Sequence, residues 1–189
     1  MFAAPLSIPG FSLRIVEDRH VGAVYETVRR NLEHLKPWMP WATDEYSLDG
    51  CRAWQRKAIE QFARNDGFNA GIFDGPSFIG VIGVHAIDWW NRKTTVGYWI
   101  DAAYQGRGIM TAACRVLLSH LFDELKLNRV EIHCATQNVR SCAIPKRLGF
   151  VDERVAREAE LLPDGRYLDH AIYTMLASEW KGLSLAIVQ

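Results

Sequence analysis

The sequence predicts a mixed α/β (α+β) fold built on one mostly antiparallel sheet that contains a single parallel pair of strands. Hydrophobic periodicity gives the element order β-α-α-β-β-β-α-β-α-β-β, without internal repeats or linkers. A long helix at 108–125 separates strands at 94–101 and 129–135, and a parallel pair needs such a crossover. With 189 residues, 49% of them hydrophobic, we expect a single domain over 1–189 with a substantial core.

The first half of the chain is expected to hold two helices and then a meander of three strands. Asp18 can cap the first helix, Pro37 ends it, and the second helix starts near Ser47. Turn residues at Asn65-Asp66-Gly67 and Gly75-Pro76 separate the second helix and the first strands of the meander. The expected elements are a strand at 11–16, helices at 18–36 and from about 47 to 65, and strands at 68–74, 77–87 and 94–101.

The second half is expected to continue with the crossover helix and to end in a hairpin. Gly149 ends a short helix with a residue suited to positive φ, and Phe150 after it is anchored in the core. Pro163-Asp164-Gly165 is turn chemistry between two strands. The expected elements are a helix at 108–125, a strand at 129–135, a helix at 138–148, and strands at 150–161 and 167–176.

Charge and cysteine usage disfavour several classes of function. The chain has 22 basic and 22 acidic residues, without the basic excess of a nucleic-acid binder. No apolar run approaches the roughly 18 residues that span a bilayer, and the N-terminus lacks a signal-peptide pattern. Four cysteines show neither C-x-x-C nor zinc-type spacing, so we expect buried thiols, no metal site and a cytoplasmic protein.

The turn Tyr104–Thr111 lies between a strand and the long helix and is the strongest functional signal. Such a turn leaves the first backbone N–H groups of the helix unpaired at the positive end of its dipole, which favours an anion. Glycines at 106 and 108 let a phosphate approach the backbone, and Arg107 adds charge. A dinucleotide fingerprint would need a third glycine at Thr111 and a strand–helix–strand pattern in the preceding chain. Residue 111 is not glycine, and residues 69–101 read as three consecutive strands joined by short turns. We therefore expect another phosphorylated cofactor.

With Gln105 in front and an antiparallel meander before it, this turn resembles the pyrophosphate loop of the GCN5-related N-acetyltransferases (GNAT), [Arg/Gln]-x-x-Gly-x-[Gly/Ala]. Gln105, Gly108 and Met110 occupy those positions. Met110 departs from the pattern, although methionine is familiar there in the ribosomal-protein N-terminal acetyltransferase (RimL/RimJ-like) branch. A second stretch, Asn138–Phe150, resembles the family pattern Asn-x-x-[Ala/Ser]…Gly-Phe. The resemblance covers about residues 10–178.

This resemblance implies the GNAT fold and direct transfer of acetyl from acetyl-CoA to a primary amine within a ternary complex. The branch implies that the amine is the N-terminal α-amine of a protein such as a ribosomal protein. Two other interpretations stay open: an enzyme acetylating a small amine (a polyamine, amino sugar or antibiotic), and a non-catalytic acyl-CoA-binding module. The implied cofactor contacts are Trp99, Ile100, Gln105, Gly106, Arg107, Gly108, Ile109, Met110, Thr111, Asn138, Ser141 and Lys146.

Two of these residues have structural as well as functional interpretations. In the family the asparagine at Asn138 binds the pantetheine arm, and asparagine is also a good helix N-cap. Many relatives place a tyrosine at Pro145 to protonate the departing thiolate, so that acid is missing here. Proline also leaves the Ser141 carbonyl without its helical donor. Ser141 is then the implied proton donor to the thiolate, or its hydroxyl bonds only within its own helix.

The amine must lose a proton before it attacks, and an α-amine with a reference pKa of about 7.7–8.0 needs less help than lysine. Glu160 matches the position of the proposed base in the ribosomal-protein branch, although a solvated acidic strand is the alternative. His85 and His133 titrate in the useful range and are rival bases. A covalent route through Cys134 or Cys142 lacks a paired histidine and acid at a recognisable spacing.

Aromatic side chains mark the expected acceptor side. The loop after the first helix carries Trp38 and Trp41, and Trp89 follows a later strand. Such clustered aromatic residues suggest a peptide-binding wall or a subunit interface, with a homodimer possible, or they simply close the core. We predict substrate contacts from these three tryptophans and His85.

Overall fold

The computed structural model describes residues 3–180 and contains one sheet of eight strands in the order β1-β2-β3-β4-β5-β6-β8-β7. Every neighbouring pair is antiparallel except β5 (Lys93–Ile100) and β6 (Arg129–Ala135), which run parallel. The predicted fold class is therefore confirmed, including the position of the parallel step. The chain beyond the predicted motif coverage, residues 181–189, lies outside the described residues.

The helices and remaining strands follow the predicted order closely. Gly108, at φ 75°, caps the crossover helix, whose last turn widens into a π-helical segment at His120–Glu124. The other strands are β1 (Ala3–Pro5), β2 (Phe11–Ile15), β3 (Phe68–Asp74), β4 (Ser77–Val84), β7 (Val151–Leu161) and β8 (Tyr167–Leu176). The helices are α1 (Val21–Arg30), α2 (Leu32–Leu35), α3 (Leu48–Ala63), α4 (Ile109–Ser119) and α5 (Val139–Arg147).

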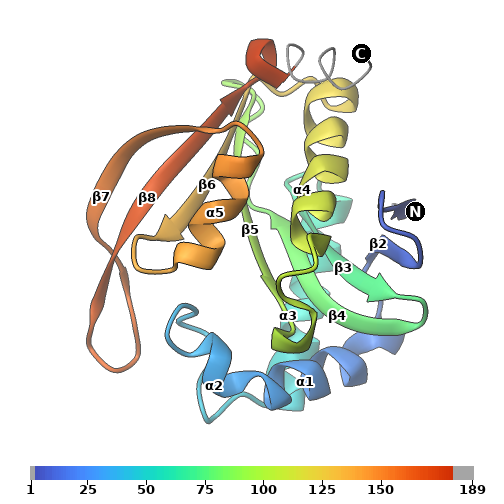
Figure 1. Cartoon of the computed structure of the whole chain (residues 1–189). Helices are drawn as coiled ribbons and strands as arrows, with labels where there is room; N and C mark the ends of the chain where they lie inside the picture. Colours follow the sequence, from blue (N-terminus) through green and yellow to red (C-terminus); the bar gives the residue numbers. More distant parts are fainter. Residues whose placement is uncertain (1–2, 181–189) are drawn as a thin grey trace.

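Helices cover both faces of the sheet and enclose two apolar cores. Helices α4 and α5 pack over β5, β6 and β8, where Leu117, Ile132 and Tyr173 are fully buried. Helices α1 and α3 cover the opposite face of the N-terminal strands, around Val24 and Phe78. In Figure 1 β5 and β6 diverge at their carboxyl ends, α2 lies below the opening, and the β7–β8 hairpin reaches down beside it.

The helix predicted at 18–36 was wrong in two respects: its first turn differs, and the helix is interrupted at Asn31. A short 3-10 turn, Asp18–His20, precedes α1, and the Glu17 backbone N–H donates to His20 Nδ1 at 3.0 Å, so Asp18 lies inside the turn and not at its cap. Asn31 then separates α1 from α2, because its side chain bonds the Thr27 carbonyl and the backbone of a distant loop. Periodicity alone cannot reveal such a tertiary contact.

The strand ends also differ from expectation. The strand predicted at 77–87 ends at Val84, after which the chain turns toward β5 through an isolated bridge between Asp88 and Lys93. Strand β1, which pairs with β2, was not predicted, since three residues carry no usable periodicity. These differences lie at the edges of the sheet and leave its centre unchanged.

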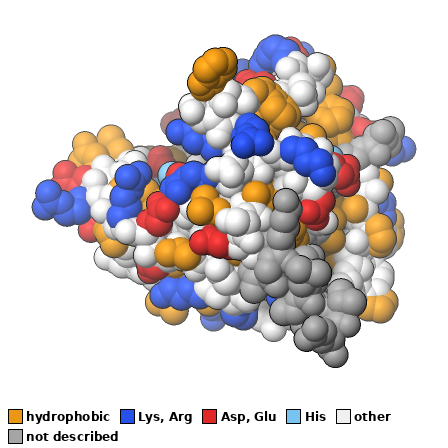
Figure 2. Space-filling model, turned by 90° about the horizontal axis from the view of Figure 1, so that it is seen from above, with side chains coloured by type: hydrophobic (Ala, Val, Ile, Leu, Met, Phe, Trp, Pro, Cys, Tyr) orange, Lys and Arg blue, Asp and Glu red, His pale blue; other side chains and the backbone are white. Residues whose placement is uncertain are grey.

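The surface carries mixed charge. In the view of Figure 2 basic and acidic side chains are interspersed, in keeping with the equal numbers of the two in the sequence. Among residues 3–180, no helix is both long and apolar enough to cross a membrane.

Two glycines provide a test of the packing. A Cβ at Gly80 in β4 would lie 2.5 Å from the Trp99 carbonyl oxygen of β5, so we expect Gly80→Ala to lower the free energy of unfolding by about 1–3 kcal/mol. Gly22 in α1 has open space around it, and Gly22→Ala should stabilise the protein by about 0.5–1 kcal/mol. Urea unfolding of both variants measures these changes. A Gly80→Ala variant as stable as the parent protein would contradict the observed spacing of β4 and β5.

Candidate functional site

The site forms where β5 and β6 separate. Their pairing covers four positions, from Lys93 opposite Arg129 to Val96 opposite Ile132, and then stops. Residues 97–100 of β5 and 133–135 of β6 consequently have no partner across the gap. Two cavities open there, one on each side of the sheet, and they share Trp38, Tyr98, Trp99, Asn138 and Ser141 among their walls. A ligand in one cavity can therefore meet a ligand in the other.

The first cavity, which we call the phosphate-loop cavity, has a volume of about 1090 Å³. Within the described chain, the backbone N–H groups of residues 106–111 donate to no protein acceptor. They lie at the N-terminus of α4, where the helix dipole favours negative charge. The predicted cofactor residues in its wall are Trp99, Ile100, Gln105, Gly106, Gly108, Ile109, Met110, Thr111, Asn138 and Ser141.

The charges around this cavity come from residues that sequence analysis did not select. Arg140 and Arg147 of α5 are part of its wall, and its described lining includes no Asp or Glu. The predicted contacts Arg107 and Lys146 are not part of the wall. Arg107 bends back to the Ala103 carbonyl at 2.9 Å, and the Lys146 ammonium lies 5.7 Å from the Tyr173 ring. The cavity thus suits an anion without either of them.

A chain of side chains crosses the mouth of the phosphate-loop cavity. The Arg140 guanidinium donates to Gln105 Oε1 at 2.7 Å, and Gln105 Nε2 lies 2.7 Å from His34 Nε2. Burial and the nearby Arg140 lower the pKa of His34, so its ring is neutral at pH 7 and can accept from the amide. Gln105, the first residue of the predicted loop motif, therefore links α2 to α5.

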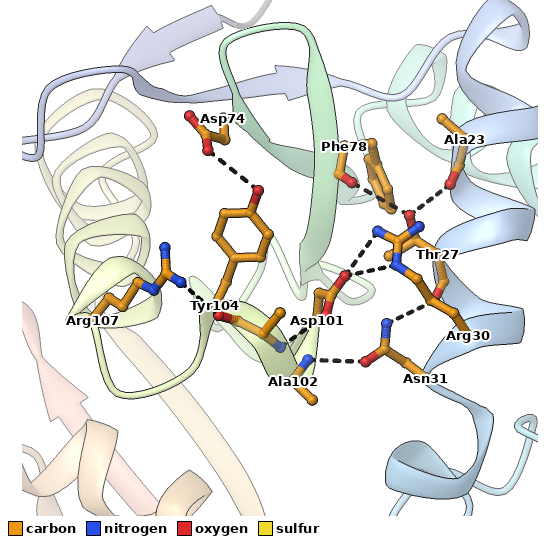
Figure 3. Close-up of polar contacts among 11 residues, drawn as sticks. Ala23, Thr27, Arg30, Asn31, Asp74, Phe78, Asp101, Ala102, Tyr104 and Arg107 are labelled. Atoms are coloured by element: carbon orange, nitrogen blue, oxygen red, sulfur yellow. Dashed lines mark hydrogen bonds and ion pairs between the residues drawn. The ribbon is translucent and has the colours of Figure 1, made fainter.

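The loop is anchored to α1 through a buried carboxylate. Asp101, at the end of β5, accepts from the Ala103 N–H at 3.0 Å and from Arg30 Nε at 2.9 Å, while Asn31 Oδ1 accepts from the Ala102 N–H. Figure 3 shows Arg30, the last residue of α1, and Asn31, directly after it, facing this turn. Burial acts to raise the pKa of Asp101, but these hydrogen bonds outweigh it and the pKa is lowered. The carboxylate stays ionised and holds the loop in place.

Tyr98 replaces the hydrogen bond that Pro145 removes from α5. Pro145 lies inside the helix and has no N–H for the Ser141 carbonyl. The Tyr98 hydroxyl of β5 donates to that carbonyl at 3.1 Å, and burial raises the pKa of the phenol, so it remains protonated. This contact also joins the two sides of the gap, since Tyr98 lies on β5 and Ser141 on the helix beside β6.

Asn138 and Ser141 lie where both cavities meet. Asn138 Oδ1 accepts the Ser141 N–H at 3.1 Å, so its N-cap role is present, and it uses only the carbonyl end of the amide. The Ser141 hydroxyl donates to Cys134 Sγ at 3.2 Å. Burial raises the pKa of the Cys134 thiol to about 11, which keeps it protonated near neutral pH and poorly suited to act as a nucleophile.

The second cavity, which we call the aromatic cavity, has a volume of about 860 Å³. Of the four residues predicted as substrate contacts, Trp38, Trp41 and His85 lie in its wall. Trp89 does not: it lies in the β4–β5 turn, and its ring N–H donates to the Asn65 carbonyl at 2.8 Å. Four aromatic residues that were not predicted as substrate contacts also line the aromatic cavity: Tyr46, Trp54, Tyr98 and Trp99.

Glu160 reaches the aromatic cavity because β7 is irregular. Pairing with β8 shifts between Ala156 and Glu160, and the Glu158 N–H at the bulge donates to Asp169 Oδ1 at 2.7 Å. Glu160 then lies opposite Leu168, half-buried in the cavity wall. The structure therefore brings Glu160 to the same cavity as Ser141, Trp38 and Trp41.

Three histidines share this wall: His85, His133 and His170. Burial, and then the neighbouring His133, lowers the pKa of His85. Burial also lowers the pKa of His170, although Glu160 opposes it. His133 Nε2 lies 2.6 Å from Glu131 Oε2, so this rival base is already engaged with a carboxylate.

Known proteins resemble the chain along nearly its whole length. A family model described as an acetyltransferase (GNAT) domain matches residues 11–151. The putative ribosomal N-acetyltransferase YdaF of Bacillus subtilis is 37% identical over 90% of this chain and 93% of that protein. The ribosomal-protein-serine acetyltransferase of Escherichia coli is 29% identical over 87% and 91%. A solved RimL, the ribosomal L7/L12 alpha-N-protein acetyltransferase in complex with coenzyme A, is 28% identical and superposes with a TM-score of 0.88 over 94% of this chain and 99% of that one.

The Tyr98–Ser141 hydrogen bond can be tested with a double-mutant cycle. Tyr98→Phe leaves the Ser141 carbonyl without a donor and should lower the free energy of unfolding by about 1–3 kcal/mol. In a Pro145→Ala background the new backbone N–H can bond that carbonyl, so the same substitution should cost clearly less. Equal costs in the two backgrounds, measured by urea unfolding, would mean that Tyr98 does not compensate for the proline.

Proposed function

Because the chain belongs to the GNAT acetyltransferase family, we propose that it transfers the acetyl group of acetyl-CoA to the N-terminal α-amine of a protein, such as a ribosomal protein. The observation that carries this proposal is the opposite charge of two joined cavities. Arginines and free N–H groups line the phosphate-loop cavity, whereas the aromatic cavity has Glu45 and Glu160 in its wall and, among the described lining residues, no Lys or Arg. One side suits a polyphosphate and the other an amine.

Acetyl-CoA fits the phosphate-loop cavity by its chemistry. The N–H groups of residues 106–111 can bind the pyrophosphate, with Arg140 and Arg147 adding positive charge. The Asn138 amide has its N–H₂ end available for the pantetheine arm, because only its oxygen caps α5. This geometry directs the thioester toward the gap between β5 and β6, where the second cavity begins.

Glu160 and Ser141 have the proton-transfer roles in this proposal. Glu160 takes a proton from the ammonium, directly or through a water, and the neutral nitrogen forms its bond to the acetyl carbon. The carbon–sulfur bond then breaks, the Ser141 hydroxyl protonates the departing thiolate, and the new amide nitrogen gives up its second proton to solvent. Ser141 is in contact with the Cys134 thiol, which can return a proton to it. Direct transfer needs no acetylated cysteine, in agreement with the raised pKa of Cys134.

A small-molecule amine is the second candidate acceptor. The aromatic cavity is about 860 Å³, which is ample for a polyamine or an amino sugar. Two features favour a protein N-terminus: the relatives with ribosomal-protein names, and the wide aromatic wall, which suits the side chains of an extended peptide. Thiol release measured with free peptides, spermidine and an aminoglycoside separates the two. Turnover confined to the small amines would contradict the proposal.

The phosphate-loop assignment can be tested by charge alone at Gly108. A Cβ there would meet nothing closer than Ile8 Cδ1 at 4.0 Å, and both Asp and Asn tolerate its left-handed conformation comparatively well. We expect Gly108→Asp to bind acetyl-CoA about tenfold or more weakly than Gly108→Asn, because its carboxylate repels the pyrophosphate. Calorimetric titration gives both affinities. Equal affinities would place the pyrophosphate elsewhere.

The role of Glu160 as the base can be tested through the pH dependence of kcat/KM. Glu160→Gln should leave acetyl-CoA affinity unchanged and lower kcat/KM for a peptide by about 100-fold. The loss should be largest at low pH, because without a base only the neutral fraction of an amine with a pKa of about 7.7–8.0 can react. A pH–rate profile parallel to that of the parent protein would assign deprotonation to His85, His170 or solvent.

A further inference from the structure

We propose that the aromatic cavity selects acceptor chains that carry a second positive charge close behind the reacting α-amine, which means a Lys or Arg side chain near the N-terminus. This inference rests on the proposed function and deepens it. Glu160 faces the α-ammonium, and Glu45 at the cavity mouth faces the second cation. An acidic side chain at the same position is rejected.

The charge of the cavity wall supports this selection. Although the chain has 22 basic residues, none is among the described residues that line the cavity, whereas Glu45 and Glu160 both are. They come from separate walls, since Glu45 lies in the loop between α2 and α3 and Glu160 lies on β7. Walls of one sign raise the local concentration of oppositely charged ligands.

Both carboxylates are available to a ligand. Within residues 3–180, neither Glu45 nor Glu160 forms a hydrogen bond or ion pair through its side chain. The neighbouring acids differ: Asp44 pairs with Lys36 at 2.7 Å, and Glu131 pairs with Arg129 and with His133. Because these nearby acids already have basic partners, Glu45 and Glu160 are the carboxylates that can bind a cationic ligand.

The remaining polar groups of the wall do not cancel this negative charge. The lowered pKa values of His85 and His170 keep both rings neutral at pH 7, and His133 is held by Glu131. Arg140 of the adjoining cavity donates to Gln105. The two cations beside the Glu45 loop, Lys36 and Arg29, bond to the side chain and the carbonyl of Asp44. The acceptor side therefore keeps a net negative charge under ordinary conditions.

Aromatic rings complete a site for cations with apolar stems. Trp41, half-exposed at 41%, lies 6.0 Å from the Tyr46 ring and 6.2 Å from the Trp99 ring, and all three line the cavity. Tyr46 directly follows Glu45, and both residues line the cavity. The aliphatic stem of Lys or Arg packs on such faces, and its cation gains from the ring electrons.

Three peptides differing only at the third residue test the selection: Ser-Ala-Arg-Ala-Phe, Ser-Ala-Ala-Ala-Phe and Ser-Ala-Glu-Ala-Phe, all as C-terminal amides. Arginine is used because its side chain cannot itself be acetylated. At low salt we expect kcat/KM to fall about fivefold from the Arg to the Ala peptide and again to the Glu peptide, with smaller steps at high salt. Equal values for the three peptides would overturn the inference and leave the proposed function intact.

Glu45→Gln should remove most of the difference in kcat/KM between the Arg and Ala peptides. The matched control is Glu26→Gln, an exposed position on α1 that lines neither cavity and changes the net charge equally. A selectivity lost equally in both variants, or retained in Glu45→Gln, would contradict a role for Glu45.

Binding provides a second readout that does not depend on turnover. Each peptide is titrated calorimetrically into the protein saturated with coenzyme A. Tightest binding of the Arg peptide and weakest binding of the Glu peptide would support the selection even if no peptide were acetylated, an outcome that would contradict the proposed function alone. Equal binding of the three, or no binding, would overturn the inference.

Discussion

The early end of pairing between β5 and β6 is the constraint on which the rest of the site depends. Four paired positions hold the strands together, and beyond Val96 and Ile132 their backbone groups and side chains face a gap. A parallel pair cannot be joined by a tight turn, so α4 must cross over, and its N-terminus arrives beside the same gap. The anion-binding turn, the widened strands and the two cavities are consequences of one topological step.

Holding such a gap open requires contacts that pass around it. Tyr98 joins β5 to α5 through the Ser141 carbonyl, and Gln105 joins α2 to α5 through His34 and Arg140. On the other side, Asp101 and Asn31 fasten the phosphate loop to α1. The elements that wall the aromatic cavity are thus tied to the loop that binds the cofactor. Occupancy of one cavity is expected to stabilise the walls of the other.

Much of the fold was predictable because the central elements have strong hydrophobic periodicity and are bounded by residues that favour turns and helix caps. Glycines at 106 and 108, Ser47 and Gly149 each mark a boundary that local backbone chemistry dictates. The break at Asn31 and the bulge before Glu160 were not predictable, since distant partners determine them. The π-helical turn after Ser119 likewise follows no local signal that we could identify.

The candidate site, like the fold, was predictable from the sequence only in part. Backbone features of the loop follow from its motif, and all the glycines and small residues predicted there line the cavity. Long side chains were harder to place: Arg107 and Lys146 carry charge near the motif yet turn away, while Arg140 and Arg147 face the cavity. Their spacing on α5 could have suggested this, because residues seven apart share a helix face. Glu45 carried no sequence signal, since its role depends on which residues line the cavity in the folded chain.

Intact-protein mass spectrometry can show whether acetyl passes directly across the gap to the amine. The protein is mixed with acetyl-CoA in the absence of any acceptor, and a peptide with a free N-terminus is then added. We expect an unchanged protein mass before the peptide is added and an acetylated peptide afterwards. An acetyl group retained on the protein and then passed to the peptide would contradict direct transfer and identify a covalent route through a thiol.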